Sequence, residues 1–452
     1  MPEASFLEPL YTAEEMRTAE RRYPGFPSTA PELMERAGAA VARVALERFP
    51  DARRFAVVCG GGSNGGDGRI AARVLREQGR DAVETHAVEQ ADVIVDALFG
   101  TGFRGEPRQE ASALIERINA AGVPVVAVDL PSGIDGSTGE SAGVAVQADV
   151  TVTFHAPKVG LAVAPGRFRA GEVVRVDIGL EDVGTEHRLV TEHILGLVPT
   201  KRPEDNKYSA GSVLVVGGAP GLTGAICLAA EAAFRADAGY VAVAVPEASL
   251  PVVETKLLEP VKLTWEHVAD GVAKATAVAL GPGLGRTEEA KRLRDRLLAE
   301  LDRPVVLDAD ALHELEPMRW LAPVVLTPHA GELARLLQEE TAWVDAHRLE
   351  AARRGAQRFD AVCLLKGADT IVAEPGGRVL VCHAEAPALA TAGTGDVLTG
   401  IVACYLAKGL EPVLAAAAAA VALAKAVRSI SALSGIVASD VIAALPRVLP
   451  RD

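Results

Sequence analysis

Two glycine-rich stretches contain the residues with the clearest chemical potential. The first runs from Cys59 to Gly68, has the sequence CGGGSNGGDG, and lies between a predicted strand and a predicted helix. Glycines let the backbone turn at positive φ and direct N–H groups at an anion above a helix N-terminus. Asn64 and Asp67 add an amide and a carboxylate, which phosphate binding alone does not require. The stretch predicts polar recognition or ion ligation; an ordinary dinucleotide site and a plain strand-to-helix turn are the alternatives.

The second stretch is ATAGTGD, from Ala390 to Asp396, and an apolar predicted helix follows it. Backbone amides at a helix N-terminus stabilise the negative charge that develops on a transferring phosphoryl group. A carboxylate in the same turn can accept a hydroxyl proton, so Asp396 is the candidate catalytic base. The alternative is that Asp396 only caps the helix. The sequence has no G-x-x-x-x-G-K-[ST] motif, so a P-loop mechanism is not supported.

Further polar residues close predicted strands of the first half. Asp96 follows VIV, and Asp129 and Ser132 follow VVAV in the segment VVAVDLPSG. Ligands of open α/β sheets bind outside the carboxyl ends of the strands, so we expect these residues to converge with Asn64. Either carboxylate alone could instead be a helix cap or a turn former. Lys158 in FHAPKVG is predicted to be a substrate-side cation or a carboxylate partner, with a solvated lysine as the alternative.

Three segments of the second half also place glycine, histidine or lysine at the ends of predicted strands. They are LGPGLG at residues 280–285, LTPHAGE with His329, and LLKGADT with Lys366 to Thr370. Glycine lets a flat ligand approach the backbone, and a lysine beside glycine can meet a nucleotide phosphate. We expect these three segments to lie at one edge of a sheet.

The elements that position these motifs alternate between short β-branched runs and amphipathic stretches, which is typical of βαβ units and mostly parallel sheets. One series starts at residue 55 and another at residue 212, while residues 180–208 lose the periodicity. The sequence therefore predicts two α/β domains, residues 1–200 and 201–452, with a boundary near 200. Residues 11–49 are expected to form two further helices, the first capped by Thr12.

Composition excludes several classes of protein. The chain has 452 residues, more than one core usually holds, and its 49% hydrophobic and 23% charged residues exclude a disordered chain. A formal net charge of -14 argues against nucleic-acid and anionic-membrane partners. The longest apolar stretch, Val413 to Ala424, is too short to span a bilayer and is expected to be a buried helix. The odd number of cysteines, without C-x-x-C spacing, and the absence of an export signal predict a cytoplasmic protein.

The first half resembles the NAD(P)H-hydrate epimerase family, which carries N-N-G-G-D, D-A-L-F-G-T-G and D-[IL]-P-S-G in that order. The matching residues here are 63–67, 96–102 and 129–133, with Ser63 where the family usually has asparagine. The resemblance implies a Rossmann-like α/β/α sandwich, Asp129 as the acid/base, and potassium held by Asn64, Asp96 and Ser132. The implied contacts to the hydrated nucleotide are Ser63, Asn64, Gly65, Gly66, Asp67, Gly100, Thr101, Gly102, Phe103, Arg104, Gly105 and Asp129.

The second half, from about residue 207, is similar to the ADP/ATP-dependent NAD(P)H-hydrate dehydratase family, which has a ribokinase-like fold. Matching stretches include KYSAGSVLVVGG, VVLDADAL, LTPHAGE, LLKGADT and ATAGTGDVLTG. RADAG and LAKAVRS depart from the usual family sequence. The resemblance implies Mg²⁺ with the nucleotide and contacts to the hydrated substrate from Ala225, Gly283, His329 and Asp396. The implied contacts to ADP or ATP are Lys366, Gly367, Ala368, Asp369, Thr370 and Gly395.

In this order the two halves resemble the bifunctional NAD(P)H-hydrate repair enzymes. The resemblance implies that the first domain interconverts the R and S epimers of NADHX and NADPHX. It implies that the second uses ADP or ATP to dehydrate the S form back to NADH or NADPH. The resemblance and the apolar N-terminal helices predict a homo-oligomer.

Three other functions fit parts of the sequence. A vitamin or sugar kinase of the ribokinase type would share the G-T-G-D turn, and its phosphorylated product would accumulate without elimination. The first domain could be a nucleotide-sensing module, which would bind the R epimer without converting it. A dinucleotide-dependent oxidoreductase would transfer hydride to a carbonyl substrate.

Overall fold

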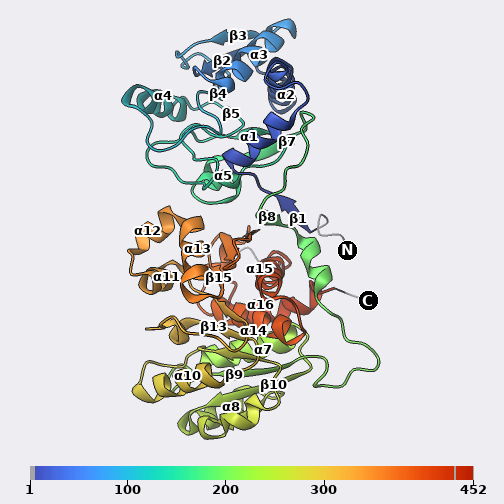
Figure 1. Ribbon diagram of the computed structural model, residues 1–452, viewed down its shortest axis with the longest axis vertical. Coiled ribbons are helices and arrows are strands. Elements are labelled where there is room, and N and C mark those ends of the chain that lie inside the picture. The colour runs from blue at the N-terminus through green and yellow to red at the C-terminus, as the bar shows by residue number, and fades with distance from the viewer. Residues whose placement is uncertain (1–5, 432–433, 451–452) are drawn as a thin grey trace. The chain divides into compact units, whose positions relative to one another are not determined.

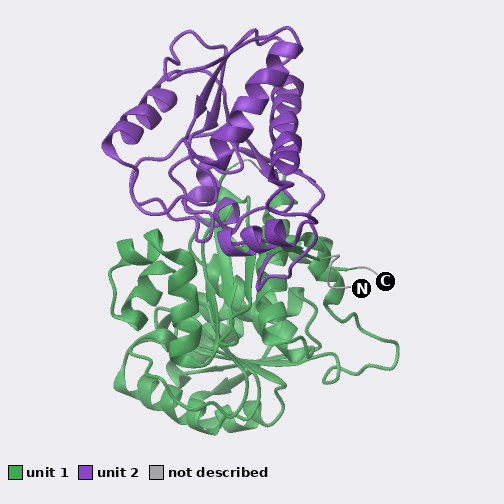
Figure 2. Cartoon of the chain, turned by 45° about the horizontal axis from the view of Figure 1, so that its top comes forward, with its two compact units in different colours: residues 1–8, 189–452 green, residues 9–188 purple. Residues whose placement is uncertain are grey.

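The computed structural model describes residues 6–431 and 434–450 and divides the chain into two compact units (Figures 1 and 2). The first unit along the chain is Pro9–Arg188, which is purple and keyed as unit 2 in Figure 2, and the second comprises the rest of the described chain, green and keyed as unit 1. The units divide before residue 200 because β8, His187–Val190, joins the sheet of the second unit. That the two functions divide near residue 200 stays a prediction.

The first unit is built on a six-stranded parallel sheet, as the alternating pattern predicts. The strand order is β3-β2-β4-β5-β6-β7, so the chain reverses its direction of travel across the sheet between β2 and β4. The carboxyl ends of strands at such a switch point form the crevice where open sheets bind ligands. The strands are β2 Arg54–Cys59, β3 Asp81–Glu84, β4 Val93–Ala97, β5 Val125–Val128, β6 Val150–Phe154 and β7 Glu172–Val176.

Helices cover both faces of this sheet because alternate strand residues point to opposite sides. Val57 and Val95 pack with the apolar faces of α2, Ala30–Arg48, and α3, Ser63–Glu77. Val58 and Ile94 pack with α4, Gln109–Ala120, on the other face. The predicted N-terminal helices are α1, Ala13–Arg22, and α2, and Thr12 caps α1 in a capping box, as expected.

The second unit contains an eleven-stranded sheet. Its order is β1-β8-β17-β16-β15-β14-β13-β12-β9-β10-β11, parallel from β11 to β15, with β16 and β17 antiparallel. A second switch point lies between β9 and β12. Besides β8, the strands of this sheet are β1 Leu7–Pro9, β9 Ser212–Val216, β10 Tyr240–Val245, β11 Val261–Thr264, β12 Ala277–Leu280, β13 Val305–Leu307, β14 Val324–Leu326, β15 Val362–Leu365, β16 Asp369–Ala373 and β17 Val379–His383.

One face of this sheet packs against α7, Thr223–Arg235, α14, Thr394–Ala407, and α15, Pro412–Arg428. The buried alanine-rich helix α15 confirms the expectation for Val413 to Ala424. No helix in the described ranges is long and apolar enough to cross a membrane. Shorter or peripheral helices are α5 Val159–Ala162, α6 Gly166–Arg169, α8 Leu250–Lys256, α9 Val268–Val272, α10 Glu288–Glu300, α11 Ala330–Leu337, α12 Thr341–Ala346, α13 Arg348–Phe359 and α16 Ala438–Ala444.

The close approach of α14 and α7 depends on Gly400, where a Cβ would lie 2.1 Å from the Ala229 carbonyl oxygen. We expect Gly400→Ala to force the helices apart and lower the free energy of unfolding by about 2 kcal/mol. Calorimetry of the full chain should show a Tm lower by roughly 4–8 °C for the second unit. Gly224→Ala is the matched control, because an added Cβ on that exposed α7 residue meets nothing within 4 Å. An unchanged Tm in Gly400→Ala would contradict the tight packing.

Candidate functional site

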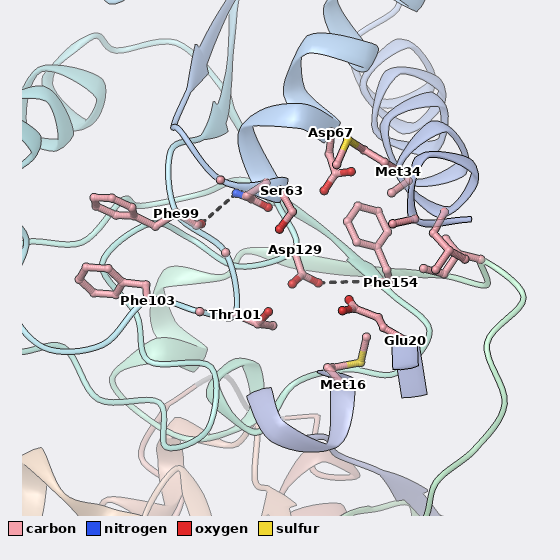
Figure 3. Close-up of a pocket in the computed structure, with 18 of the residues that line it drawn as sticks. Met16, Glu20, Met34, Ser63, Asp67, Phe99, Thr101, Phe103, Asp129 and Phe154 are labelled. Carbon is pink, nitrogen blue, oxygen red and sulfur yellow. Dashed lines mark hydrogen bonds between the residues drawn. The ribbon is translucent and has the colours of Figure 1, made fainter. Parts of the chain in front are cut away.

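A cavity of about 550 Å³ lies in the first unit, at the carboxyl ends of β2, β4 and β5 (Figure 3). Its size is typical of a small-molecule site. Nine of the twelve predicted contacts line it: Ser63, Asn64, Asp67, Gly100, Thr101, Gly102, Phe103, Arg104 and Asp129. The structure thus brings together the glycine-rich loop, the segment after β4 and the turn after β5, as the switch point requires.

The other three predicted contacts, Gly65, Gly66 and Gly105, are not among the lining residues. Gly65 and Gly66 lie in the first turn of α3 and serve packing. A Cβ on Gly65 would lie 2.0 Å from the Gly60 carbonyl oxygen, and one on Gly66 would lie 2.4 Å from the Met34 sulfur. These glycines let the helix start close to the loop and to α2.

Asp129 stands at a strained turn after β5, with a φ of 65° that is rare for a residue other than glycine. Its Oδ1 accepts a hydrogen bond of 2.5 Å from Lys158 Nζ and one of 3.2 Å from Thr153 Oγ1. Lys158 is fully buried and also donates to Thr153 Oγ1 and the Phe154 carbonyl. Of the two roles predicted for Lys158, the structure supports the carboxylate partner.

Two other carboxyl groups face the same cavity, Asp67 from α3 and Glu20 from α1. Burial, with the charges of Asp129 and Glu20, raises the pKa of Asp67 to about 8. Burial and the charge of Asp129 also raise the pKa of Glu20. Sequence reasoning missed Glu20 and its neighbour Met16, because α1 carries no motif and only the fold directs it at the cavity.

The predicted ion ligands lie together beneath the glycine-rich loop. Ser132 Oγ donates to Asp96 Oδ1 at 2.6 Å, and the Ser132 backbone N–H donates to Oδ2 at 2.8 Å. Asn64 Nδ2 donates to the Phe99 carbonyl at 2.9 Å, and the Phe99 N–H donates to Ser132 Oγ at 2.8 Å. Asp96 is fully buried, and burial raises its pKa to about 6 although these donors favour the anion. Its hydrogen-bond donors in the described chain are all neutral, so the site lacks the positive charge that a bound cation would supply.

The second unit assembles a comparable group around Asp396. Gly393, with a φ of 91°, is the N-cap of α14, and its capping involves no side-chain hydrogen bond. Asp396 lies in the first turn of that helix and has no hydrogen bond to it among the described side-chain contacts. Burial, together with the charge of Asp308, raises the pKa of Asp396 to about 7. The carboxyl group is therefore not merely a helix cap.

Lys366 supplies positive charge beside Asp308, Glu332 and Asp396. Its Nζ donates to Asp308 Oδ1 at 2.8 Å, and Thr399 Oγ1 donates to the other oxygen, Oδ2, at 2.7 Å. Glu332 Oε2 lies 3.9 Å from the ammonium. Desolvation would lower the pKa of Lys366, but Asp308 and Glu332 outweigh it and raise the pKa. Asp308 and Glu332 stand in the motifs VVLDADAL and LTPHAGE, but sequence reasoning did not single them out.

Arg348, which belongs to no sequence motif, contacts the segment from Lys366 to Thr370 and fixes its conformation. Arg348 Nε lies 2.7 Å from Asp369 Oδ1, and Nη2 donates to the Lys366 carbonyl at 3.3 Å. A Cβ on Gly367 would lie 2.2 Å from Arg348 Nη2, so the backbone lies against the guanidinium. Asp369 is buried in this ion pair, and Thr370 Oγ1 donates to the Gly367 carbonyl. Contacts of this segment with a nucleotide, including Ala368, stay a prediction.

The remaining predicted contacts follow strands of the same sheet. The Ala219 N–H donates to the Gly283 carbonyl at 2.7 Å, which joins the turn after β12 to the loop that leads into Ala225 on α7. His329 is the N-cap of α11, and its Nδ1 accepts from the Gly331 N–H at 3.0 Å. Nδ1 is thereby held as the acceptor, and Nε2 of the exposed ring lies 3.6 Å from Glu332 Oε1. Gly395 is in the turn of Asp396, where its Cβ would lie 3.4 Å from Lys366 Nζ.

Comparisons with known proteins match both units. The family model described as NAD(P)H-hydrate dehydratase matches residues 213–447, and that of the YjeF-related protein N-terminus matches residues 30–90 and 80–160. The bifunctional NAD(P)H-hydrate repair enzyme Nnr of Moorella thermoacetica is 38% identical over 85% of this chain and 85% of its own. That of Escherichia coli is 35% identical over 92% of this chain and 89% of its own.

A solved structure agrees with the second unit. It is the ADP/ATP-dependent NAD(P)H-hydrate dehydratase of Bacillus subtilis, co-crystallised with ATP and Mg²⁺. It is 31% identical, has a TM-score of 0.52, and covers 57% of this chain and 96% of its own. A ribokinase-like superfamily protein of Enterococcus faecalis has a TM-score of 0.51 at 25% identity, over 60% of this chain and 98% of its own. The ribokinase-like fold of the second unit is thus confirmed.

The ion pair of Asp308 with Lys366 predicts a stability effect. Asp308→Asn removes the nearest anion from a mostly buried ammonium, so we expect the free energy of unfolding at pH 7 to fall by about 3 kcal/mol. Calorimetry should report the loss in the second unit. Glu314→Gln is the matched control, because it opens the exposed pair of Lys291 and Glu314 at 2.9 Å, and no measurable loss is expected. Equal effects of the two variants would contradict the importance of burial.

Proposed function

Because the chain belongs to the family of bifunctional NAD(P)H-hydrate repair enzymes, we propose that its two units divide this repair between them. The unit of residues 9–188 interconverts the R and S epimers of NADHX and NADPHX. The second unit uses ADP or ATP to dehydrate the S form and return NADH or NADPH. The substrates and the nucleotide are small ligands, and no nucleic acid or membrane takes part.

A single observation carries the proposal for the second unit: a carboxyl group with a pKa near neutrality lies in a glycine turn beside a lysine. Hydroxide is a poor leaving group, whereas a phosphate ester leaves readily. Asp396 accepts the proton of the C6 hydroxyl as the hydroxyl oxygen attacks the terminal phosphorus of the nucleotide. The bond from that phosphorus to the bridging oxygen breaks, so ATP leaves as ADP and ADP leaves as AMP. The amides of Gly393 to Gly395 and the ammonium of Lys366 stabilise the developing negative charge. Phosphate then leaves with the electron pair of the C6–O bond, C5 loses a proton to water, and the C5–C6 double bond of the ring is restored.

Two groups of contacts complete the proposed dehydratase site. Ala225, Gly283 and His329 contact the hydrated substrate, and the segment from Lys366 to Thr370 contacts ADP or ATP. Mg²⁺ prefers carboxylate and phosphate oxygens, so Glu332 would help to hold it together with the phosphates. Bound Mg²⁺ supplies positive charge that offsets the phosphoryl oxygens.

For the first unit we propose that Asp129 is the acid/base and that the cavity residues bind the hydrated nicotinamide nucleotide. Asn64, Asp96 and Ser132 would hold K⁺, because they gather hard oxygen atoms around a buried carboxylate whose donors are neutral. The bound ion supplies charge compensation there. Gly65, Gly66 and Gly105 stay predicted contacts. A homo-oligomer and a cytoplasmic location also stay predictions.

The proton acceptor of the dehydratase is tested by pH. Only ionised Asp396 can accept a proton, so kcat/KM for dehydration of the S epimer should rise with pH to about 7 and level off above it. Asp396→Asn should lower kcat by at least ~100-fold, measured by the regained absorbance of the reduced ring.

Asp129→Ala should abolish epimerisation and leave ADP-driven dehydration intact. Loss of both activities in Asp129→Ala would contradict the division, and a phosphorylated product that accumulates would indicate a kinase.

The proposed cation site is tested by stability. KCl should raise the Tm of the first unit relative to choline chloride at equal ionic strength, because a ligand of the folded state stabilises it. At a K⁺ concentration of ten times the Kd, the free energy of unfolding rises by about 1.4 kcal/mol, which raises the Tm by roughly 3–5 °C. Asp96→Asn should abolish the difference, and Asp51→Asn, at an exposed turn, should retain it. An equal response to both salts in the unaltered chain would contradict the site.

A further inference from the structure

Three carboxyl groups from three elements face the cavity of the first unit, but only one of them has a counter-ion. Asp129, after β5, is paired with Lys158 at 2.5 Å. Asp67 on α3 and Glu20 on α1 have no hydrogen bond or ion pair through their carboxyl groups among the described contacts. Figure 3 shows Asp67 beside Met34 and Asp129 nearer Glu20, with all three carboxyl groups turned into the cavity. The pocket thus offers one carboxyl group that is paired with an ammonium and two that have no counter-ion among the described contacts.

The surroundings of Asp67 favour its neutral form. The α2 side of the cavity is apolar, with Leu33, Met34 and Ala37. The charged groups that face Asp67 are Glu20 on α1, Asp129 after β5 and Lys158 before α5, and the two anions outweigh the one cation. Arg104, in the loop after β4, lines the cavity as well, but it is exposed. Together with burial, these charges raise the pKa of Asp67 to about 8, so the group retains its proton at neutral pH.

The proposed epimerisation at C6 needs two carboxyl groups that differ in this way. Inverting C6 requires that a bond to this carbon break on one face of the ring and form again on the other. C6 bears a hydroxyl group and adjoins the ring nitrogen N1, whose lone pair can expel that oxygen once it is protonated. The returning water must lose a proton as it adds. One proton donor and one proton acceptor are therefore needed in the same cavity.

We propose that Asp67 is the proton donor and Asp129 the proton acceptor of this inversion, an inference that rests on the proposed epimerase function. The Asp67 proton passes to the C6 hydroxyl, the C6–O bond breaks, water leaves, and the N1 lone pair forms the N1–C6 double bond of an iminium ion. A second water then adds to C6 from the other face and restores the lone pair on N1. The proton lost by that water passes to Asp129.

Atoms and charge balance in this sequence, since one water leaves and one enters, and one proton moves from Asp67 to Asp129. The reverse reaction uses the same two groups with their roles exchanged. Lys158 donates to Asp129 Oδ1 and so orients this carboxyl group toward its role as acceptor. Glu20 acts through Asp67, because its negative charge favours retention of the Asp67 proton.

The first test is Asp67→Asn in the full chain, with Asp51→Asn as the matched surface control. We expect kcat for conversion of the R epimer to fall at least ~100-fold with KM changed only a few-fold, measured by chromatography of the two epimers. The thermal transition of the first unit reports that the variant is folded. A raised KM with unchanged kcat would show that Asp67 only binds substrate and would overturn the proposal.

The second test separates a proton donor from a merely structural carboxyl. With Asp67 active only when protonated, kcat/KM for epimerisation should fall above about pH 8. Glu20→Gln removes a neighbouring negative charge, so the pKa of Asp67 drops and the fall should move to lower pH. Glu116→Gln, at an exposed position of α4, is the control and should leave the profile unchanged. No shift in Glu20→Gln, or a shift to higher pH, would contradict the assignment.

The third test follows the oxygen atom. Epimerisation in H₂¹⁸O should place ¹⁸O at C6 at the rate of inversion, measured by mass spectrometry against an enzyme-free sample. Retention of ¹⁶O in the inverted product would overturn the proposed C–O cleavage. If the unaltered chain converts neither epimer, the epimerase function itself fails. If it does, and Asp67→Asn matches its kcat, only the role of Asp67 fails.

Discussion

The two candidate sites depend on one type of interaction, an ion pair between a lysine and the aspartate at the end of a parallel strand. Lys158 pairs with Asp129 in the first unit, and Lys366 pairs with Asp308 in the second. Each pair leaves another carboxyl nearby without a counter-ion of its own, on a helix that begins at a glycine turn. Helix amides stabilise an anion by only about 0.3–1 kcal/mol, less than one pKa unit of 1.36 kcal/mol. Burial therefore prevails and raises the pKa of Asp67 to about 8 and that of Asp396 to about 7.

Sheet topology brings these groups together. Parallel strands place all their carboxyl ends at one edge, and the chain reverses direction between β2 and β4 and again between β9 and β12. Loops diverge at such a point and leave a crevice, which the glycine-rich loop lines in the first unit. Helix α2 closes that crevice with apolar side chains, so a carboxyl on α3 loses water on one side. The same packing that stabilises the unit thus sets the protonation of Asp67.

The sequence predicts the fold class and the motif residues well, because strand-end aspartates and glycine turns are local features. Asn64, Asp96 and Ser132 are far apart in the chain, yet the rule for parallel strands predicts their proximity, which the hydrogen bonds confirm. Glu20 and Arg348 could not be predicted, since each lies on an amphipathic helix and reaches its site only through tertiary packing. Gly65 and Gly66 match the motif, but the close contact of α3 with α2 and the loop accounts for them. A motif alone does not separate a packing glycine from a ligand contact.

The two lysines explain why similar pairs of carboxyl groups suit different chemistry. An ammonium has three donors, and Lys158 uses them on Asp129, Thr153 and the Phe154 carbonyl, fully buried beneath the cavity. It orients Asp129, but it has no donor left for a ligand. Lys366 donates to Asp308 alone among the described hydrogen bonds, and it lies against the turn of Gly395. Donors remain for a phosphoryl oxygen, so phosphoryl transfer fits the second site, while the first suits proton transfer between carboxyl groups and water.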